Sequence, residues 1–409
     1  MSTAQTFSYT SRNSGGKLVR GRMEAPSESM VVTRLRTMGL SPVAIEVATS
    51  GTGLNRDITL PGFEKKVPLR DIAVMSRQLA TMVGAGLSLL RALTILTDQT
   101  ENARLAAALD SIRTDVERGS SLSEAVAKHG RIFPPIMVHL VRAGELGGFL
   151  DRSLESIAET FEADVKLRAT ITSALTYPAI VLVMAIVSVI AMLIFIVPVF
   201  QKMFADLGGT LPVPTLILVS LSQNMVWIAP VLAVLAVAAA VWWRANGRND
   251  DVRAVVDPLK FRLPVFGLLM RKVAIARFTR NFATMTGAGV PILQSLEIVG
   301  QTSGNWVIEQ ALLRVRDSVR GGNSIAAPLM KEPVFPAMVT QMIAVGEDSG
   351  SMETMLDKIA DFYEAEVQAT TESLTSLIEP LMIGVIGAVI GSMIVALYLP
   401  MFTIYGQIQ

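Results

Sequence analysis

The chain has 409 residues, of which 51% are hydrophobic and only 17% charged, and its mean hydropathy of +0.48 indicates a membrane protein. A formal net charge of +1 gives no electrostatic reason to expect a nucleic-acid partner. The lack of cysteine excludes disulfides and thiolate chemistry, and two histidines are too few for a histidine-rich metal cluster. We expect neither a metal nor a cofactor.

The first 21 residues, "MSTAQTFSYTSRNSGGKLVRG", are polar, and they contain no apolar run of the length found in signal peptides. We therefore expect the chain to start in the cytosol. Two strands around Gly15-Gly16, a helix in "SESMVVTRLRTMGL" and a strand in "PVAIEVA" predict a small α+β domain over residues 1–50. Residues 51–70 are expected to be its linker.

An internal repeat organises the rest of the chain. The phrase "RQLATMVGAGLSLLRALTI" returns 203 residues later as "RNFATMTGAGVPILQSLEI". After a slip of one residue, the offset of 202 aligns Pro178 with Pro380 and Pro198 with Pro400. Each copy has apolar residues at helical spacing, so we expect two homologous cytoplasmic bundles of about six helices each, over 71–176 and 273–379.

One apolar stripe illustrates this spacing in both copies. Its members are Leu154, Ile157, Ala158 and Phe161, which recur as Leu356, Ile359, Ala360 and Tyr363. Residues at these spacings lie on one face of an α-helix, so we expect the stripe to face the core of each bundle.

Three long stretches carry no charged residue, which a membrane-spanning helix avoids because a charge in hydrocarbon is costly. About 20 apolar residues suffice to cross about 30 Å of hydrocarbon. We place transmembrane helices at 177–198, 222–243 and 380–401. The fold class is then a mainly α, polytopic membrane protein with two bundles, three spans and a small N-terminal α+β domain.

The orientation of the spans follows from basic residues beside them, which mark the cytoplasmic side. Residues 244–280 contain nine basic and three acidic side chains. We expect 244–272 to be a basic cytoplasmic linker, 199–221 an external loop and 402–409 an external tail. The second span is then the extra element that returns the chain, so that both bundles lie on one side.

The repeated "GAG" phrase predicts a tight corner between two helices. Gly84 and Gly86 in the first copy, and Gly287 and Gly289 in the second, follow one amphipathic run and precede another. A phosphate-binding loop is not expected, because no G-x-x-x-x-G-K-[ST] sequence occurs in the chain.

The repeated "GELGG" and "GEDSG" phrases, at 144–148 and 346–350, predict further turns between helices at Gly144 and Gly346. Glu145 and Glu347 have alternative interpretations. They stabilise the start of the next helix through its dipole, contact a basic partner, or form a carboxylate cation site with a neighbouring aspartate.

Prolines and glycines in the spans suggest joints and contacts. Pro178 and Pro380 lie where a long helix enters the membrane, so we expect each to kink that helix and to leave one carbonyl without its donor. Gly384, Gly387 and Gly391 give the third span a small-residue face, which favours packing against another span of this chain or of a neighbour.

The duplicated "GAG" and "GE..G" phrases, the "FPPIM" and "FPAM" steps before the second phrase, and three spans in this order resemble a known family. It is the inner-membrane platform family of type II secretion systems, where it is called protein F, and of type IV pilus machines. The N-terminal pattern "G.L..G..EA.S......L...GL.P" is similar to its small leading domain. Gly147 departs from the family, which usually has Ser or Thr there, as Ser349 does in the second copy.

The resemblance implies a non-enzymatic assembly platform in the bacterial inner membrane. Its bundles would engage a hexameric assembly or secretion ATPase, and its spans would pass pilin or pseudopilin helices into a growing fibre. Other inner-membrane machine components, membrane lipid and a second copy of the chain are further expected partners, and nucleic acid is not.

Two other classes of membrane protein fit the sequence less well than a platform. A small transporter or channel would need ionisable groups or broken helices at mid-membrane depth, where this sequence has mostly Ser, Gln and Asn as its polar residues. A receptor would need an output domain, and none is recognisable.

Overall fold

The computed structural model describes residues 5–12, 18–25, 28–37, 41–47, 67–206, 211–247, 249–264 and 266–405. The chain divides into two units, Met1–Lys66 and Val67–Gln409, which are described separately.

The described residues of the first unit form three strands and a helix. They are β1 (Gln5–Arg12), β2 (Leu18–Ala25), α1 (Glu28–Thr37) and β3 (Ser41–Val47). The strands form an antiparallel sheet in the order β2-β1-β3, and α1 packs against it through Val31 and Leu35, which lie one turn apart and are fully buried. The expected Gly15-Gly16 turn and most of the expected linker lie outside the described residues.

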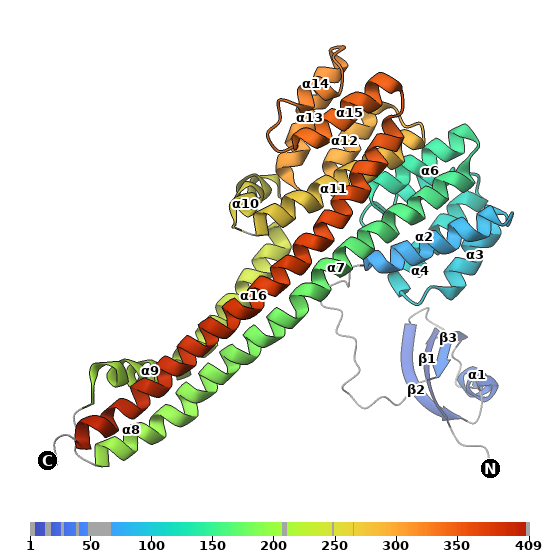
Figure 1. Cartoon of the computed structure of the whole chain (residues 1–409). Coiled ribbons are helices and arrows are strands. Elements are labelled where there is room, and N and C mark those ends of the chain that lie inside the picture. Colours follow the sequence, from blue (N-terminus) through green and yellow to red (C-terminus); the bar gives the residue numbers. More distant parts are fainter. Residues whose placement is uncertain are drawn as a thin grey trace. The chain divides into compact units, whose positions relative to one another are not determined.

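Each copy of the repeat contributes six helices to the second unit, as predicted (Figure 1). The first copy contains α2 (Leu69–Gly84), α3 (Leu89–Gln99), α4 (Ala103–Glu117), α5 (Leu122–Ala127), α6 (Pro135–Gly147) and α7 (Leu150–Ala191). The second copy contains α11 (Phe266–Gly287), α12 (Ile292–Thr302), α13 (Trp306–Arg320), α14 (Ala326–Leu329), α15 (Ala337–Ser349) and α16 (Met352–Tyr405).

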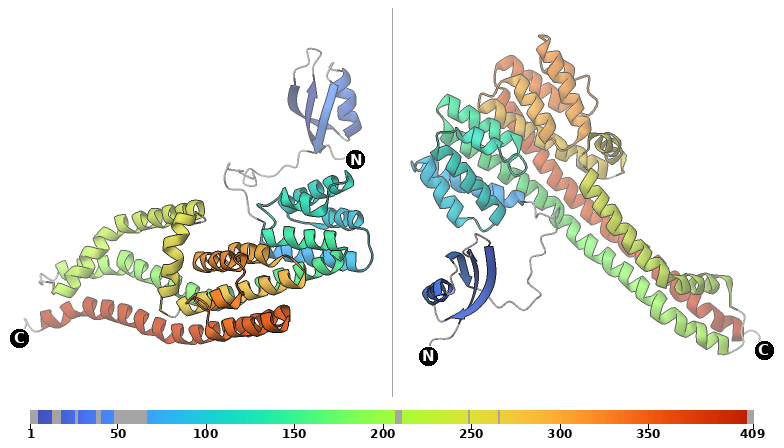
Figure 2. Two further views of the ribbon diagram at one scale, coloured as in Figure 1. Left: turned by 90° about the horizontal axis from the view of Figure 1, so that it is seen from above. Right: turned by 180° about the vertical axis from the view of Figure 1, so that it is seen from behind.

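The two bundles share one continuous hydrophobic core. All members of the apolar stripe predicted from the sequence are buried in α7 and in α16. The copies touch where α7 and α6 of the first meet α11 and α12 of the second, and α7 and α16 also run side by side away from the bundles (Figure 2). The duplicated bundles therefore form one packed body and not two independent ones.

A duplicated arginine ties the first helix of each copy to its last. Arg77 of α2 bonds to Glu155 and Glu162 of α7, the latter at 2.6 Å, and this hydrogen bond lowers the pKa of the Glu162 carboxyl. Arg280 of α11 contacts three carboxylates of α16 at 2.6 to 3.1 Å, those of Asp357, Asp361 and Glu364. The same residue type thus closes both bundles.

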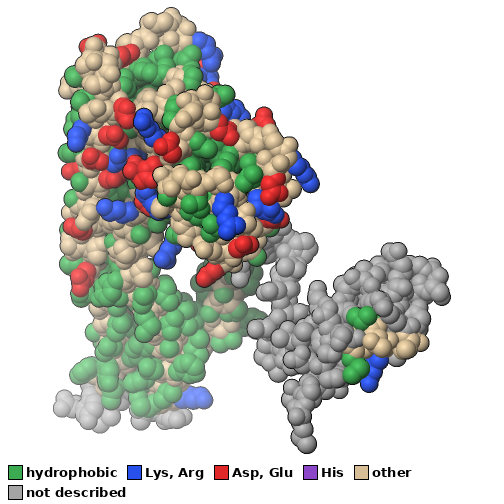
Figure 3. Space-filling view, turned by 90° about the vertical axis from the view of Figure 1, so that its right-hand side faces the viewer, with side chains coloured by type: hydrophobic (Ala, Val, Ile, Leu, Met, Phe, Trp, Pro, Cys, Tyr) green, Lys and Arg blue, Asp and Glu red, His purple; other side chains and the backbone are tan. Residues whose placement is uncertain are grey.

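Within the described part of the chain, three helices are long and apolar enough to cross a membrane, which confirms the predicted number of spans. The first is α7, which continues through a π-helical turn η1 (Met192–Ile196) into α8 (Val197–Asp206). The others are α9 (Val213–Asn246) and α16. Hydrophobic side chains cover the part of the molecule formed by these helices, whereas charged side chains gather on the bundles (Figure 3).

The connections between the spans are more helical than we expected. Most of the expected loop 199–221 is helical, because α8 continues to Asp206 and α9 begins at Val213, after Pro212 and with Pro214 in its first turn. The end of an apolar run in the sequence indicates where a helix leaves the lipid. The backbone hydrogen bonds of the helix can continue beyond that point. Residues 207–210 lie outside the described part.

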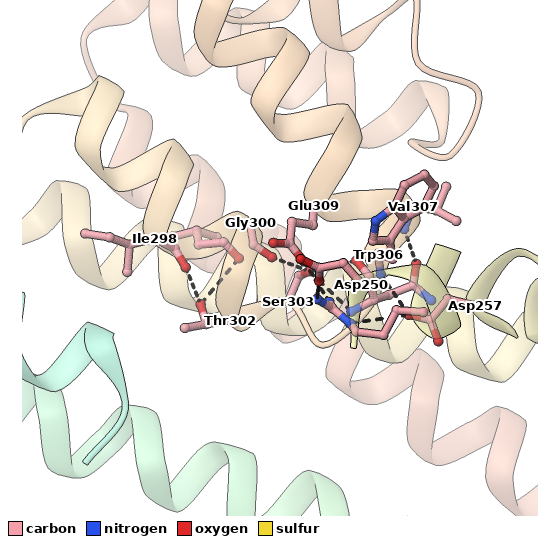
Figure 4. Close-up of polar contacts among 12 residues, drawn as sticks. Asp250, Asp257, Ile298, Gly300, Thr302, Ser303, Trp306, Val307 and Glu309 are labelled. Atoms are coloured by element: carbon pink, nitrogen blue, oxygen red, sulfur yellow. Dashed lines mark hydrogen bonds and ion pairs between the residues drawn. The ribbon is translucent and has the colours of Figure 1, made fainter. Parts of the chain in front are cut away.

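The expected basic linker 244–272 is also mostly helical. Its central part is α10 (Asp250–Arg262), which packs on α11 and α13. Asp257, only 4% exposed, accepts the backbone N–H of Trp306 at 2.9 Å at the start of α13 and bonds to Lys260 at 2.8 Å. Arg253 reaches Glu309 of α13 at 2.7 Å. Figure 4 shows Asp257 beside Trp306 at the start of that helix. These contacts hold the segment against the second bundle.

Candidate functional site

The "GAG" phrases form corners between helices in both copies. Backbone φ is +88° at Gly86 and +70° at Gly289, a left-handed conformation that favours glycine. Both helix ends close with matching backbone bonds, in which Gly86 donates to Val83 and Gly289 donates to Thr286. Gly84 and Gly287 are the last residues of α2 and α11. The glycines of this phrase therefore form a turn between two helices.

The "GE..G" phrases hold the most connected polar side chains of the duplicated corners. Glu145 of α6 accepts hydrogen bonds from the backbone N–H groups of Leu122 and Ser123, at the start of α5. Glu347 of α15 accepts from Ile325 at 2.7 Å and from Ala326 at 3.1 Å, at the start of α14. A carboxylate is favourable there because the first N–H groups of a helix have no intrahelical acceptor.

A serine completes each of these helix starts. Ser121 accepts the N–H of Glu124, and Ser324 accepts the N–H of Ala327, both at 3.2 Å. Serine and glutamate together satisfy three successive N–H groups in each copy. One of the predicted alternatives was that the glutamates stabilise the helix that follows them, but they cap the short helix that precedes them. Their role as partner contacts stays a prediction.

The predicted turn residues Gly144 and Gly346 lie inside α6 and α15, and the turns themselves form at Gly148 and Gly350. The glycine before each glutamate instead allows close helix packing. A Cβ at Gly144 would lie 2.5 Å from Oγ of Ser153 on α7, and a Cβ at Gly346 would lie 3.1 Å from Cα of Met352 on α16. A side chain at either position would push α6 from α7, or α15 from α16. The corner therefore fixes where the long helix leaves the bundle.

The two corners differ in one pair of positions. A Cβ at Gly147 would lie 1.9 Å from the ring of Phe149, so the ring in its present position requires glycine there. In the second copy the aligned residues are Ser349 and Ser351, whose hydroxyls lie 2.6 Å apart. The departure of Gly147 from the family pattern is thus explained by the phenylalanine two residues later.

Polar contacts also join the two copies, and sequence reasoning missed them. Arg277 of α11 pairs with Asp164 of α7 at 2.8 Å, and Thr160 lies 3.1 Å from Thr284. Burial lowers the pKa of Arg277, and the charge of Asp164 opposes that effect. Arg277 aligns with Val74 of the first copy. A search for charges that break the repeat would have found it.

A cavity of about 580 Å³ lies between the copies, beside α7, α11 and the start of α16. Ser153, Thr284, Arg280 and Asp357 lie in its wall, where Arg280 and Asp357 are already paired at 3.1 Å. Among the described residues, no group of three or more His, Asp or Glu side chains is arranged to hold a metal ion.

Pro178 and Pro380 are the predicted joints, and the third span carries the predicted small-residue face. Pro178 and Pro380 lie inside α7 and α16, and neither proline interrupts its helix. A Cβ at Gly384, Gly387 or Gly391 would meet no atom of the described chain within 4 Å. These glycines therefore do not pack against another described span of the same chain, and contact with a neighbouring molecule stays a prediction.

Replacement of Glu347 by alanine should uncap α14. We expect a loss of about 1 to 2 kcal/mol in the free energy of unfolding, because two N–H groups lose their acceptor. Amide hydrogen exchange, measured by mass spectrometry, should accelerate at Ile325 and Ala326. Asp348→Ala, which removes an exposed carboxylate one residue away, is the control. Equal exchange in both variants would contradict the capping role.

The contact between His139 of α6 and Gln294 of α12 predicts sensitivity to acid. The amide nitrogen of Gln294 lies 2.9 Å from Nδ1 of His139, and an amide nitrogen donates, so Nδ1 must be unprotonated. Burial lowers the pKa of His139, Arg142 lowers it further, and Glu297 opposes them.

Because the folded pKa lies below the unfolded value of about 6.5, the unfolded chain binds more protons in this range. Stability should therefore fall as the pH drops from above the unfolded pKa through the folded one. Thermal unfolding of wild type and His139→Gln across this range measures the effect. The variant cannot titrate at this position, so its profile should be flatter, and parallel profiles would refute the assignment.

Comparison with known proteins gives matches over nearly the whole chain. Residues 75–198 and 278–400 match the family described as type II secretion system (T2SS) protein F, and residues 1–46 match the N-terminal domain of that family. The chain is 42% identical to the type IV pilus assembly protein PilC of Thermus thermophilus over 404 residues, which are 98% of this chain and 99% of that protein.

Two further relatives come from both kinds of machine. The type IV pilus assembly protein PilC of Myxococcus xanthus is 41% identical over 409 residues, 100% of this chain and 96% of that protein. The type II secretion system protein F of Xanthomonas campestris is 32% identical over 407 residues, 98% of this chain and 99% of that protein. The chain therefore belongs to the family of inner-membrane platform proteins that contains type II secretion system protein F and PilC.

Proposed function

We propose that the chain couples a cytoplasmic assembly or secretion ATPase to the movement of pilin or pseudopilin helices into a growing fibre. As a member of its family, it is an inner-membrane platform protein of a pilus or secretion machine. What the family membership leaves open is how this chain would connect a soluble motor to helices in the membrane.

One observation carries the proposal: the last helix of each bundle is also a membrane span. In α7, Leu154 and Phe161 are buried in the shared core, and the same helix runs on to Ala191 in the apolar region. The second copy repeats this in α16, whose 54 residues measure about 80 Å at 1.5 Å per residue. A continuous helix transmits a displacement of the bundle to the span.

The distribution of side chains supports a division of tasks. The bundles carry the charged surface that a soluble ATPase would contact, and the spans carry the apolar surface that a pilin helix would contact (Figure 3). Other inner-membrane components and lipid would surround the spans. The exposed face with Gly384 and Gly387 is open for a second copy of the chain, which would make the platform a homo-oligomer.

No catalytic step is part of this proposal, since the motor would supply the chemical energy. The alternative of a small transporter or channel finds less support. Ser222 and Thr215, two polar side chains of the second span, face neighbouring helices and bond to their backbones. Side chains used in this way do not line a path for a solute.

A helix insertion tests mechanical coupling. Four glycines placed between Thr172 and Ser173 of α7 make that segment flexible, because glycine disfavours a helix by about 1 kcal/mol per residue relative to alanine. We expect fibre output to fall to background in a strain with this variant as its sole copy, while the variant still reaches the membrane. Pilin or pseudopilin in the sheared fibre fraction is the readout.

Four alanines at the same place are the matched control. They keep the helix continuous and add close to one full turn, so we expect substantially more fibre than with the glycine insertion. If both insertions give the same output, a rigid connection through α7 is not needed and the coupling proposal fails.

Orientation is tested separately by reporter fusions at residues 160, 210, 260 and 409. The basic segment and the three spans support cytoplasmic bundles, so we expect cytoplasmic reporters to be active at 160 and 260 and external reporters at 210 and 409. An external location for residue 260 would contradict the proposed arrangement, whatever the fibre assay shows.

A further inference from the structure

Pro198 and Pro400 occupy equivalent positions near the end of the first and third spans, 202 residues apart. Proline has no backbone N–H, so it leaves a carbonyl about one turn earlier without its helical donor. In hydrocarbon no water replaces that donor, and an unsatisfied carbonyl is costly. Each of these two carbonyl groups therefore needs a hydrogen-bond donor from elsewhere in the structure.

In the first copy the carbonyl belongs to Leu193, inside the π-helical turn. Val197 donates its N–H to the carbonyl of Met192, five residues back, so the next bond in this series would run from residue 198 to Leu193. Pro198 cannot form it. The hydroxyl of Ser222 on α9 donates to the carbonyl of Leu193 instead.

In the second copy the carbonyl belongs to Ala396. An α-helix would bond it to the N–H of residue 400, four residues later, and that residue is proline. The hydroxyl of Thr215, also on α9, donates to the carbonyl of Ala396. Both proline-dependent carbonyls are thus satisfied by side chains of the second span, the one span that is not part of the repeat.

The spacing of the two hydroxyls on α9 suits this arrangement. The buried residues of this helix are Thr215, Val219, Ser222 and Met225, which form a single stripe at spacings of four and three. Thr215 and Ser222 are 1% and 4% exposed, and two helical turns separate them. Ser and Thr in helices usually donate to a carbonyl of their own helix, as Ser392 does to Val389, but these two donate across helices.

We infer that the second span is a hydrogen-bonding clamp that joins the spans of the two copies at their repeated prolines. Ser222 holds the first span at Leu193, and Thr215 holds the third at Ala396. The clamp gives α9 a role beyond returning the chain across the membrane, and it does not depend on the partners proposed above.

Two double-mutant cycles on the detergent-solubilised full chain test the clamp. Ser222→Ala should lower the melting temperature by on the order of 2 °C. In a Pro198→Ala background residue 198 regains its N–H, so Ser222→Ala should have little further effect. Thr215→Val and Pro400→Ala form the equivalent cycle for the other carbonyl. Each cycle is read as a difference between backgrounds, so any effect of the proline replacement itself cancels.

Matched controls separate hydrogen bonding from packing. Ser220→Ala removes an exposed hydroxyl from the same helix and should leave the melting temperature unchanged. Thr215→Ser keeps the donor, so the effect of its lost methyl group should be the same with and without Pro400. The clamp is refuted if Ser222→Ala and Thr215→Val have no effect in the wild-type chain. It is equally refuted if their effects are the same with and without the prolines.

Discussion

The burial of one apolar stripe, present on α7 and again on α16, is the interaction on which the rest of the structure depends. It closes each bundle, and because the two stripes face one shared core it also joins the bundles to each other. Arg77 and Arg280 fix the first helix of each copy against the same helices. Since α7 and α16 continue into the apolar region, the packing of the bundles also sets the position of two spans.

The sequence allowed the repeat, the number of helices in each copy and the three spans to be predicted, because each depends on spacing along one chain. It did not reveal that residues 199–221 and 244–272 are mostly helical, since apolar content and charge do not report backbone hydrogen bonding. The acceptor role of Glu145 needed the start of α5 to be placed beside α6 in space. Partners that lie far apart in sequence leave no periodic signal.

The copies are similar where each folds on itself and different where they meet. Arg277 aligns with Val74, which is half exposed in the first copy. Arg277 instead pairs with Asp164 across the boundary between the copies. A duplicated unit that contacts its own copy with two different faces cannot remain symmetric. The second span adds a further asymmetry, because it contacts both copies and has no counterpart in the repeat.

The pair formed by Gly147 and Phe149 has a consequence for how the two corners diverge. The ring of Phe149 occupies the space that any side chain at 147 would need, whereas Ser349 and Ser351 bond to each other. A single Gly147→Ser substitution would place its side chain against the ring of Phe149. The first copy could therefore accept serine at 147 only with a second change at 149. Exchange of corners between copies, or between relatives, therefore requires both positions to move as a unit.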